Sequence, residues 1–237
     1  MKGLQRPETL VTAVARSISE AIMHGELSPG EALPEHRLAT ELGTSRGTVR
    51  EALRLLGDQG LVDIFLHRGA FVATLTPQKA HEISTLRANL ESFAVRLAMS
   101  QGAYTQAALG ELEAALRDLE RVTSGPDPLA VAEADMYFHD VLSQASNHEL
   151  LLDVLQELRL QMCYFIVYTK LIGSDIESEL ATHARVLEAI RTGDAEIAAA
   201  AVHRHIIEAG EHLLAKLDAL DSSPSPDYLL TTSGVSQ

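Results

Sequence analysis

Four side chains in the second half of the chain have the chemistry and spacing of metal ligands. Asp135 and His139 are four residues apart, so on a helix they share one face and can reach the same ion. His183 lies 10 residues before a break at Gly193, and His205 lies 12 residues after it. If the flanking helices fold back on each other, both imidazoles lie about 15–18 Å from the turn, at one level of a bundle. Three imidazoles and one carboxylate suit a divalent ion, Zn²⁺ first and Ni²⁺ or Mn²⁺ as alternatives.

The spacing alone leaves the role of these histidines open. Core histidines that only form hydrogen bonds are common, so a structural role is an alternative to a metal. His203 also competes with His205, because a helix turns about 200° in two residues and only one of the pair can face inward. Four other histidines are expected at the surface or at helix ends: His24, His81, His148 and His212.

A stripe of arginines near the start of the chain has the spacing of a helix face. Arg46, Arg50 and Arg54 follow one another at intervals of four. A separate, buried face is predicted by apolar residues at helical spacing, namely Val49, Ala52, Leu53 and Leu56. The stripe suits DNA recognition, since arginine in the major groove contacts guanine bidentately. The alternative is a solvated face that pairs with Glu51 or Asp58.

The elements around this stripe favour DNA recognition. Helices are predicted over 9–24 and 35–42 and from Thr44 or Ser45 to about 59. Strands over 61–65 and 70–74 form a hairpin with Arg68 and Gly69 near its tip. The hydroxyls of Thr44 and Ser45, with the N–H groups of the helix N-terminus, suit phosphate oxygens. This order predicts a winged helix-turn-helix domain over residues 1–76.

The rest of the chain is predicted to be helical. Helices are expected over 77–101, 105–122, 128–146, 148–171, 175–192 and 194–220. They predict an all-helical bundle domain over 77–221, so the fold class is mainly α, with a winged domain before a bundle. Residues 222–237 are small, polar and proline-containing, and are predicted to be a disordered tail.

Charge is distributed unevenly between these two domains. The chain carries a net charge of −14, but residues 1–76 contribute only −1 and the remainder −13. The acidity therefore belongs to the bundle and does not exclude DNA as a partner of the first domain. The single cysteine, Cys163, rules out a disulfide within the chain. Neither a signal peptide nor a membrane span is recognisable, so a cytoplasmic location is expected.

The first domain resembles the GntR family of bacterial regulators. The matching motifs are Gly25-x-Leu-x-Pro-Gly30, Leu33-x-Glu35, Leu38-Ala39, Leu42-Gly43-x-Ser45-Arg46-x-x-Val49-Arg50-Glu51-Ala52-Leu53, Gly60-Leu61-Val62 and Arg68-Gly69-Ala70-Phe71-Val72. His36 stands where relatives often have a DNA-contacting arginine, which implies a weaker or pH-sensitive contact. Gly47-Thr48 replaces the usual Thr-Pro pair. The DNA-binding residues expected on this basis are His36, Thr44, Ser45, Arg46, Thr48, Arg50, Arg68 and Gly69.

The second domain resembles the FCD effector domain of FadR-type GntR regulators. The matching residues are Arg87-x-x-x-Glu91, Asp135-x-x-x-His139, Asn147, His183-x-x-x-Leu187-x-Ala189-Ile190-x-x-Gly193-Asp194 and His205. In that family the aspartate and three histidines hold a metal that helps to bind a small carboxylate. The resemblance implies His205, rather than His203, as the ligand. It also suggests Arg87 for the effector carboxylate, with an ion pair to Glu91 as the alternative. Asn147 is expected either in the pocket or as a helix cap.

These features together predict a homodimeric transcriptional regulator that acts as a repressor rather than an enzyme. Its partners would be double-stranded operator DNA and a small organic or sugar acid. Three alternatives remain: a regulator for which the metal itself is the signal, the same fold with acyl ligands and no metal, and a metal-dependent hydrolase.

Overall fold

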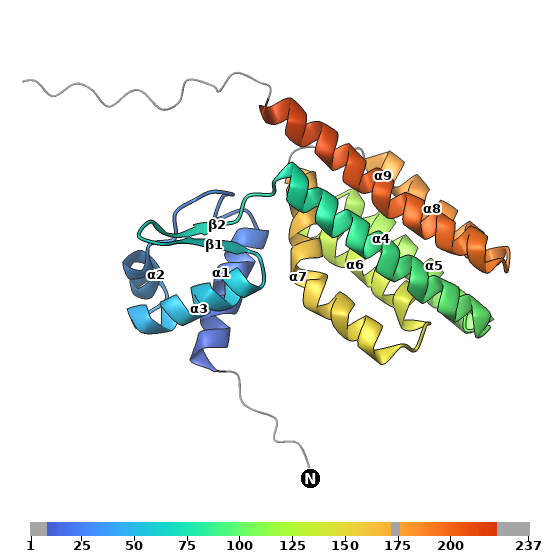
Figure 1. Ribbon diagram of the computed structural model, residues 1–237, viewed down its shortest axis with the longest axis horizontal. Coiled ribbons are helices and arrows are strands. Elements are labelled where there is room, and N and C mark those ends of the chain that lie inside the picture. Colours follow the sequence, from blue (N-terminus) through green and yellow to red (C-terminus); the bar gives the residue numbers. More distant parts are fainter. Residues whose placement is uncertain (1–8, 172–175, 222–237) are drawn as a thin grey trace, which may run out of the picture.

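A computed structural model describes residues 9–171 and 176–221 of the protein. The predicted tail over 222–237 lies outside these described residues. The first domain contains α1 (Leu10–Met23), α2 (Glu35–Glu41), α3 (Arg46–Asp58), β1 (Val62–Phe65) and β2 (Gly69–Val72). Three helices followed by a hairpin are the elements of a winged helix-turn-helix, as the sequence predicts. Figure 1 shows this domain beside a separate bundle of helices.

The start of α3 is determined by a capping residue and its orientation by an apolar face. The hydroxyl of Ser45 accepts the backbone N–H of Thr48 at 3.1 Å, which satisfies one of the unpaired donors of the first turn. The predicted apolar face is buried against α1 and the hairpin. Before α3 the chain turns sharply at Gly43, whose φ of +61° is a left-handed conformation that glycine adopts without strain.

The hairpin forms the wing. β1 and β2 pair antiparallel from Val62 opposite Val72 to Phe65 opposite Gly69. Each strand is slightly shorter than predicted, because pairing ends at Val72 and residues beyond it lead towards α4 (Pro77–Ser100). The turn between the strands includes His67, with φ of +64°, and Gly69 closes it with φ of +94°.

The bundle consists of helices whose bounds follow the predicted ones closely. They are α4, α5 (Gln106–Thr123), α6 (Pro128–Gln144), α7 (Glu149–Leu171), α8 (Ile176–Arg191) and α9 (Ala195–Asp221). α4 and α9 pack along each other, as Figure 1 shows. Their closest approach needs a glycine, since a Cβ at Gly210 would lie 2.6 Å from Ser84. None of the helices in the described residues is long and apolar enough to span a membrane.

The two domains meet along α7. The hydroxyl of Tyr164 on α7 donates a hydrogen bond to the carbonyl of Ala73, just after β2, at 2.7 Å. Gln161 packs closely on Gly60. A Cβ atom at Gly60 would lie 2.9 Å from the Cδ atom of Gln161. Buried residues of α7 and of the winged domain belong to one apolar cluster. Helix α7 therefore shares a core with the DNA-binding domain as well as with the bundle.

Candidate metal centre and nucleic-acid interface

Helices α6, α8 and α9 bring the four predicted metal ligands together inside the bundle. The Nε2 atoms of His139 and His205 lie 3.2 Å apart. One ring nitrogen of each of His139, His183 and His205 falls within 4.8 Å of the others, and all three residues are buried. Asp135 completes the group, with Oδ1 2.9 Å from Nε2 of His183 and Oδ2 3.9 Å from Nε2 of His139.

The competition between the two neighbouring histidines of α9 is decided by burial. His205 is 7% exposed and its ring lies 4.2 Å from that of His183, centroid to centroid. His203 is exposed on the other side of the helix. The fold-back of α8 and α9 around Gly193 therefore puts His183 and His205 at one level, as their spacing predicts.

Two residues contact the histidines in a way that the sequence did not predict. Glu91 on α4 is 1% exposed and its Oε2 lies 2.5 Å from Nδ1 of His139. Thr182 on α8 places its hydroxyl 2.7 Å from Nδ1 of His205. Partners on the second ring nitrogen determine which tautomer and orientation a metal-binding histidine has. The signal for Glu91 was its position four residues after Arg87, on the same helix face; Thr182 gave no signal.

Burial and neighbouring charges both shift the pKa values of the ionisable groups in this cluster. Burial lowers the pKa of both His139 and His205, because the imidazolium ion loses its hydration. Burial alone would raise the pKa of Asp135. The hydrogen bond from His183 and the positive charge of Arg87 outweigh that effect and hold this pKa well below its usual range. Neutral imidazoles beside an ionised carboxylate are the protonation states that bind metal.

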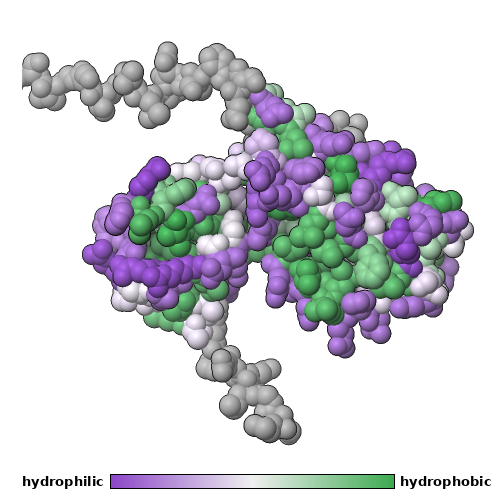
Figure 2. Space-filling view, viewed as in Figure 1, coloured by the Kyte–Doolittle hydropathy of each residue, from purple (hydrophilic) through white to green (hydrophobic). Residues whose placement is uncertain are grey.

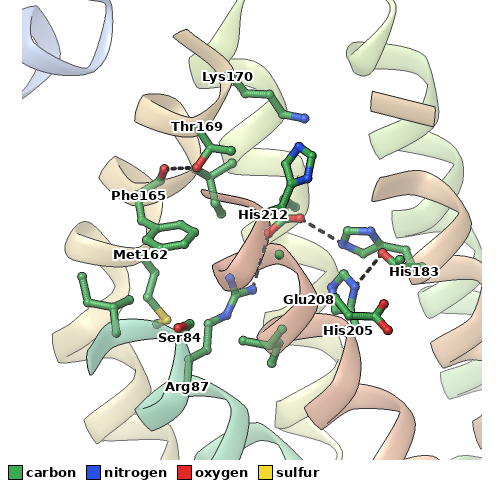
Figure 3. A pocket seen from close by; sticks show the side chains of 16 residues that line it. Ser84, Arg87, Met162, Phe165, Thr169, Lys170, His183, His205, Glu208 and His212 are labelled. Atoms are coloured by element: carbon green, nitrogen blue, oxygen red, sulfur yellow. Dashed lines mark hydrogen bonds and ion pairs between the residues drawn. The ribbon is translucent and has the colours of Figure 1, made fainter. Parts of the chain in front are cut away.

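A cavity of about 240 Å³ opens directly onto this cluster. Figure 3 shows His183 and His205 on one side of it, Met162 and Phe165 of α7 on the other, and Arg87 pointing in from α4. The remaining lining residues are Ile83, Ser84, Asp135, Ile166, Thr169, Lys170, Thr182, Ile206, Glu208, Ala209 and His212. His212, expected only as a surface residue, is exposed but also borders the cavity.

Arg87 forms the ion pair with Glu91 that the sequence left as one of two alternatives. Its Nε donates to Glu91 at 2.7 Å, and Nη2 lies 3.4 Å from Asp135. It also lines the cavity. Because a guanidinium has five N–H donors, these two contacts leave others for a ligand.

Asn147 does not line this cavity among the described residues. It lies exposed in the turn between α6 and α7, in a left-handed conformation with φ of +48°. The first turn of α7 is instead capped by His148, whose Nδ1 accepts the N–H of Leu151 at 3.2 Å. The structure thus places Asn147 in an exposed turn away from the cavity, and a contact with the effector stays a prediction.

The arginine stripe of α3 is exposed, but its members differ in what they contact. Arg46 lies in the first turn and forms no ion pair with the described residues. Arg50 donates to both carboxylate oxygens of Glu35 on α2, at 2.7 and 2.6 Å. The hydrogen bonds from Arg50 lower the pKa of Glu35. Arg54 pairs with Glu51 at 2.7 Å, so the solvated pairing considered for the stripe applies to Arg54.

The hydroxyl residues at the start of α3 are not equivalent. Ser45 and Thr48 lie 2.9 Å apart through their hydroxyl oxygens, and Ser45 is exposed. Thr44 differs, because its hydroxyl oxygen is buried without a hydrogen-bond partner in the described residues. Its backbone N–H donates to the carbonyl of Ala39 at 2.9 Å. In this conformation the hydroxyl of Thr44 is buried, and its contact with a phosphate stays a prediction.

The other expected DNA-binding residues lie on α2 and in the turn of the hairpin. His36 is exposed on α2. In the wing, the guanidinium of Arg68 lies 5.2 Å from the ring centre of Phe65 and 5.7 Å from that of Phe71. Gly69 has open space where a side chain would be. The wing tip is therefore a positive charge held on two aromatic rings.

Comparison with known proteins assigns both domains. A model of the gntR family of bacterial regulatory proteins matches residues 10–72, and a model of the FCD domain matches residues 82–208. The HTH-type transcriptional regulator YdhC of Bacillus subtilis is 28% identical over 213 residues, covering 89% of this chain and 93% of that protein. The gluconate operon transcriptional repressor of Bacillus licheniformis is 28% identical over 210 residues, covering 86% and 84%.

A solved structure supports the same fold. A GntR transcriptional regulator from Rhodococcus superposes with a TM-score of 0.70 at 23% identity, covering 90% of this chain and 99% of that chain. The protein belongs to the GntR family and carries an FCD domain. It is a DNA-binding transcriptional regulator, and its relatives are regulators rather than enzymes, so the hydrolase alternative is set aside.

Proposed function

We propose that a small carboxylate metabolite, bound beside a divalent metal ion in the cavity of the bundle, controls how tightly this regulator binds operator DNA. The observation that carries the proposal is a set of three buried imidazoles beside the carboxylate of Asp135, at a cavity that an arginine also lines. The likeness to the gluconate operon repressor supports repression as the direction of control.

The donor set fits a metal ion. The carboxylate of Glu91 favours a proton on Nδ1 of His139, which leaves Nε2 of that ring with a lone pair. This lone pair faces Nε2 of His205 at 3.2 Å. A shared proton would satisfy only these two nitrogens, whereas one ion satisfies all three imidazoles and Asp135. Nitrogen and oxygen donors suit Zn²⁺, and also Ni²⁺ or Mn²⁺. When bound, the ion would accept a carboxylate oxygen of the effector.

Arg87 would supply the second contact to that carboxylate. It approaches the cavity from α4 while His183 and His205 approach it from α8 and α9. Its 3.4 Å contact with Asp135 is long, and a carboxylate ligand would offer the same guanidinium a better acceptor. A metal that acts alone as the signal would not require a cavity beside it, so the cavity favours the carboxylate.

The DNA contacts would come from α3 and the wing. We propose that Arg46 reads base edges in the major groove, since it is exposed in the first turn of α3. Arg50 would either leave Glu35 and contact DNA, or contact DNA while Glu35 still orients its guanidinium. Ser45 and Thr48 would meet phosphate, His36 would approach the same groove from α2, and the wing would contribute Arg68 and Gly69.

Helix α7 would couple the two sites. Met162 on α7 lines the cavity, whereas Tyr164 on the same helix donates to Ala73 of the winged domain. A ligand that contacts α7 therefore changes the position of a helix on which the winged domain rests. Control requires only that the ligand binds one arrangement of the domains more tightly than the other.

We infer that the regulator is a homodimer and that α4 and α7 form its interface. Leu86 and Phe93 on α4 are 46% and 44% exposed, and Leu150 on α7 is 70% exposed. Figure 2 shows an apolar area over these two helices. Monomers seldom expose a continuous apolar patch, and a two-fold dimer matches a palindromic operator.

The proposal is tested by comparing His139→Ala with His203→Ala, a matched change of an exposed histidine. Operator DNA is first enriched from random DNA by the protein itself. We expect His139→Ala to lose metal, measured by elemental analysis, and to lose the effect of carboxylates on operator affinity while it still binds operator. His203→Ala should retain both. The proposal would be refuted if the wild-type protein takes up no divalent metal. It would also be refuted if His139→Ala keeps the metal content and the carboxylate response of the wild type.

A further inference from the structure

We infer that the effector is a monocarboxylic acid with an apolar body, a short hydrocarbon chain or a single ring, and that α7 selects it against polyhydroxy sugar acids. This inference rests on the proposed function, since it assumes that a carboxylate binds at the histidine cluster. It adds the chemistry of the rest of the ligand, which the metal and Arg87 do not determine.

The cavity has two chemically different walls. The groups that suit a carboxylate gather on one wall, around His183 and His205, with Arg87 beside them. The opposite wall is α7, which presents the thioether of Met162, the ring of Phe165 and the side chain of Ile166. Figure 3 shows the Phe165 ring directed into the space between the walls. A ligand whose carboxylate lies at the first wall must place its body against the second.

Apart from Lys170, α7 and the neighbouring Ser84 of α4 offer a ligand no free hydroxyl donor. Thr169 lines the cavity, but its hydroxyl donates to the carbonyl of Phe165 at 2.8 Å. Ser84, next to Met162 in Figure 3, donates to the carbonyl of Ala80 at 2.9 Å. Both hydroxyls can therefore only accept. Each hydroxyl of a sugar acid that loses water here without a full set of partners costs about 1–3 kcal/mol.

The size and the mouth of the cavity limit the ligand further. A volume of about 240 Å³ is below the range of about 300–1,000 Å³ that is typical of sites for drug-sized ligands. The polar residues Glu208 and His212 are exposed, so they border the opening rather than the interior, and Lys170 is the partly buried cation of the α7 wall. The interior therefore suits a small acid whose body is apolar, with polar substituents tolerated only at its outer end.

Two acids separate the body from the head group. Gluconate and 2-hydroxyhexanoate have the same chain length, charge and 2-hydroxycarboxylate head, and differ only in the hydroxyls on the body. Calorimetric titration of the metal-loaded, full-length protein should show 2-hydroxyhexanoate binding at least about tenfold more tightly. Equal or tighter binding of gluconate would overturn this inference while leaving the proposed function intact. If neither of these acids binds, nor acetate, the proposed function fails and the inference with it.

Substitutions on α7 test whether that wall makes the selection. Phe165→Ala should weaken binding of 2-hydroxyhexanoate about tenfold or more without changing metal content, and Phe165→Leu should restore most of it. If the alanine variant does not fold, Met162→Gln provides the same test with little change in volume. An amide at this position should narrow the preference over gluconate by at least about threefold. If metal-loaded Met162→Gln keeps the wild-type ratio of affinities for 2-hydroxyhexanoate and gluconate, α7 does not make the selection.

Discussion

The recognition surface and the histidine cluster both contain an arginine–glutamate pair, but in opposite environments. The Arg50–Glu35 pair joins α3 to α2 with side chains that are 51% and 26% exposed. The Arg87–Glu91 pair lies within α4 with side chains that are 9% and 2% exposed. A surface pair adds little stability and can be exchanged for another anion, as a DNA-binding arginine requires. A buried pair cannot lose one partner without leaving a charge in the core.

The difference indicates how each region performs its function. On α3 the ion pairs are exposed and weakened by water, so their arginines are available to DNA. Binding then replaces a carboxylate partner with a group of the DNA. In the bundle the charges are organised before any ligand arrives, since Glu91 contacts both Arg87 and His139. The recognition surface selects DNA through contacts formed on binding. The histidine cluster selects a ligand through side chains whose positions are fixed before binding.

The largest effect is expected from removing the buried carboxylate. Glu91→Ala should lower the free energy of unfolding by about 3–5 kcal/mol, because Arg87 would keep its charge in the core without its closest partner. Urea denaturation measures this change. Glu35→Ala, the matched loss at the exposed pair, should change stability far less. Comparable losses in the two variants would break the distinction between the regions.

A pH series on metal-free protein tests the buried histidines. Folding lowers the pKa of His139 and His205 below the ordinary value of 6.5. As the pH falls through 6.5 the unfolded chain takes up protons that the folded protein still excludes, so stability present above that pH is lost below it. The loss should not exceed about 1.4 kcal/mol per pH unit for each histidine. His205→Ala should flatten the dependence of stability on pH between pH 7.5 and 5.5. His203→Ala, at an exposed histidine, should leave this dependence unchanged. The reverse result would argue against buried neutral imidazoles.

The recognition surface is tested by removing an exposed charge. Arg46→Ala should weaken operator binding about tenfold to a hundredfold without altering stability, because Arg46 forms no ion pair with the described residues. Fluorescence anisotropy with labelled operator measures the affinity. Arg54→Ala removes the same charge from a residue already paired with Glu51 and should have a smaller effect. A larger effect at Arg54 would move the recognition contact along the helix.

The smallest effect concerns the contact that joins the two regions. Tyr164→Phe removes one hydrogen bond to Ala73, so it should cost about 0.5–1.5 kcal/mol of stability and reduce the effector-dependent change in operator affinity. Affinity for the effector itself should be retained. Tyr137→Phe, an exposed tyrosine of α6, is the control. An unchanged effector response in Tyr164→Phe would place the coupling elsewhere.

Much of the fold could be predicted because its signals are local. Periodic apolar residues, a Ser45 cap and glycines at turns identify each helix from its own segment. The i, i+4 pair Asp135–His139 and the symmetric placement of His183 and His205 about Gly193 were likewise visible. Side-chain placement was less predictable where it depends on a neighbouring segment, as for Thr44, whose hydroxyl is buried, and Asn147, which faces solvent.

The sequence by itself determined the order of the elements, the exposed arginine stripe and the residue types able to bind a metal. Only the tertiary structure decided that His205 faces inward, that Glu91 and Thr182 orient the imidazoles, and that α7 supplies an apolar wall to the cavity. The physical reason is that periodicity records which side of a helix is buried, but not which charges meet there. Those partners, and the loss of water that strengthens their interaction, exist only once α4, α6, α8 and α9 have packed together.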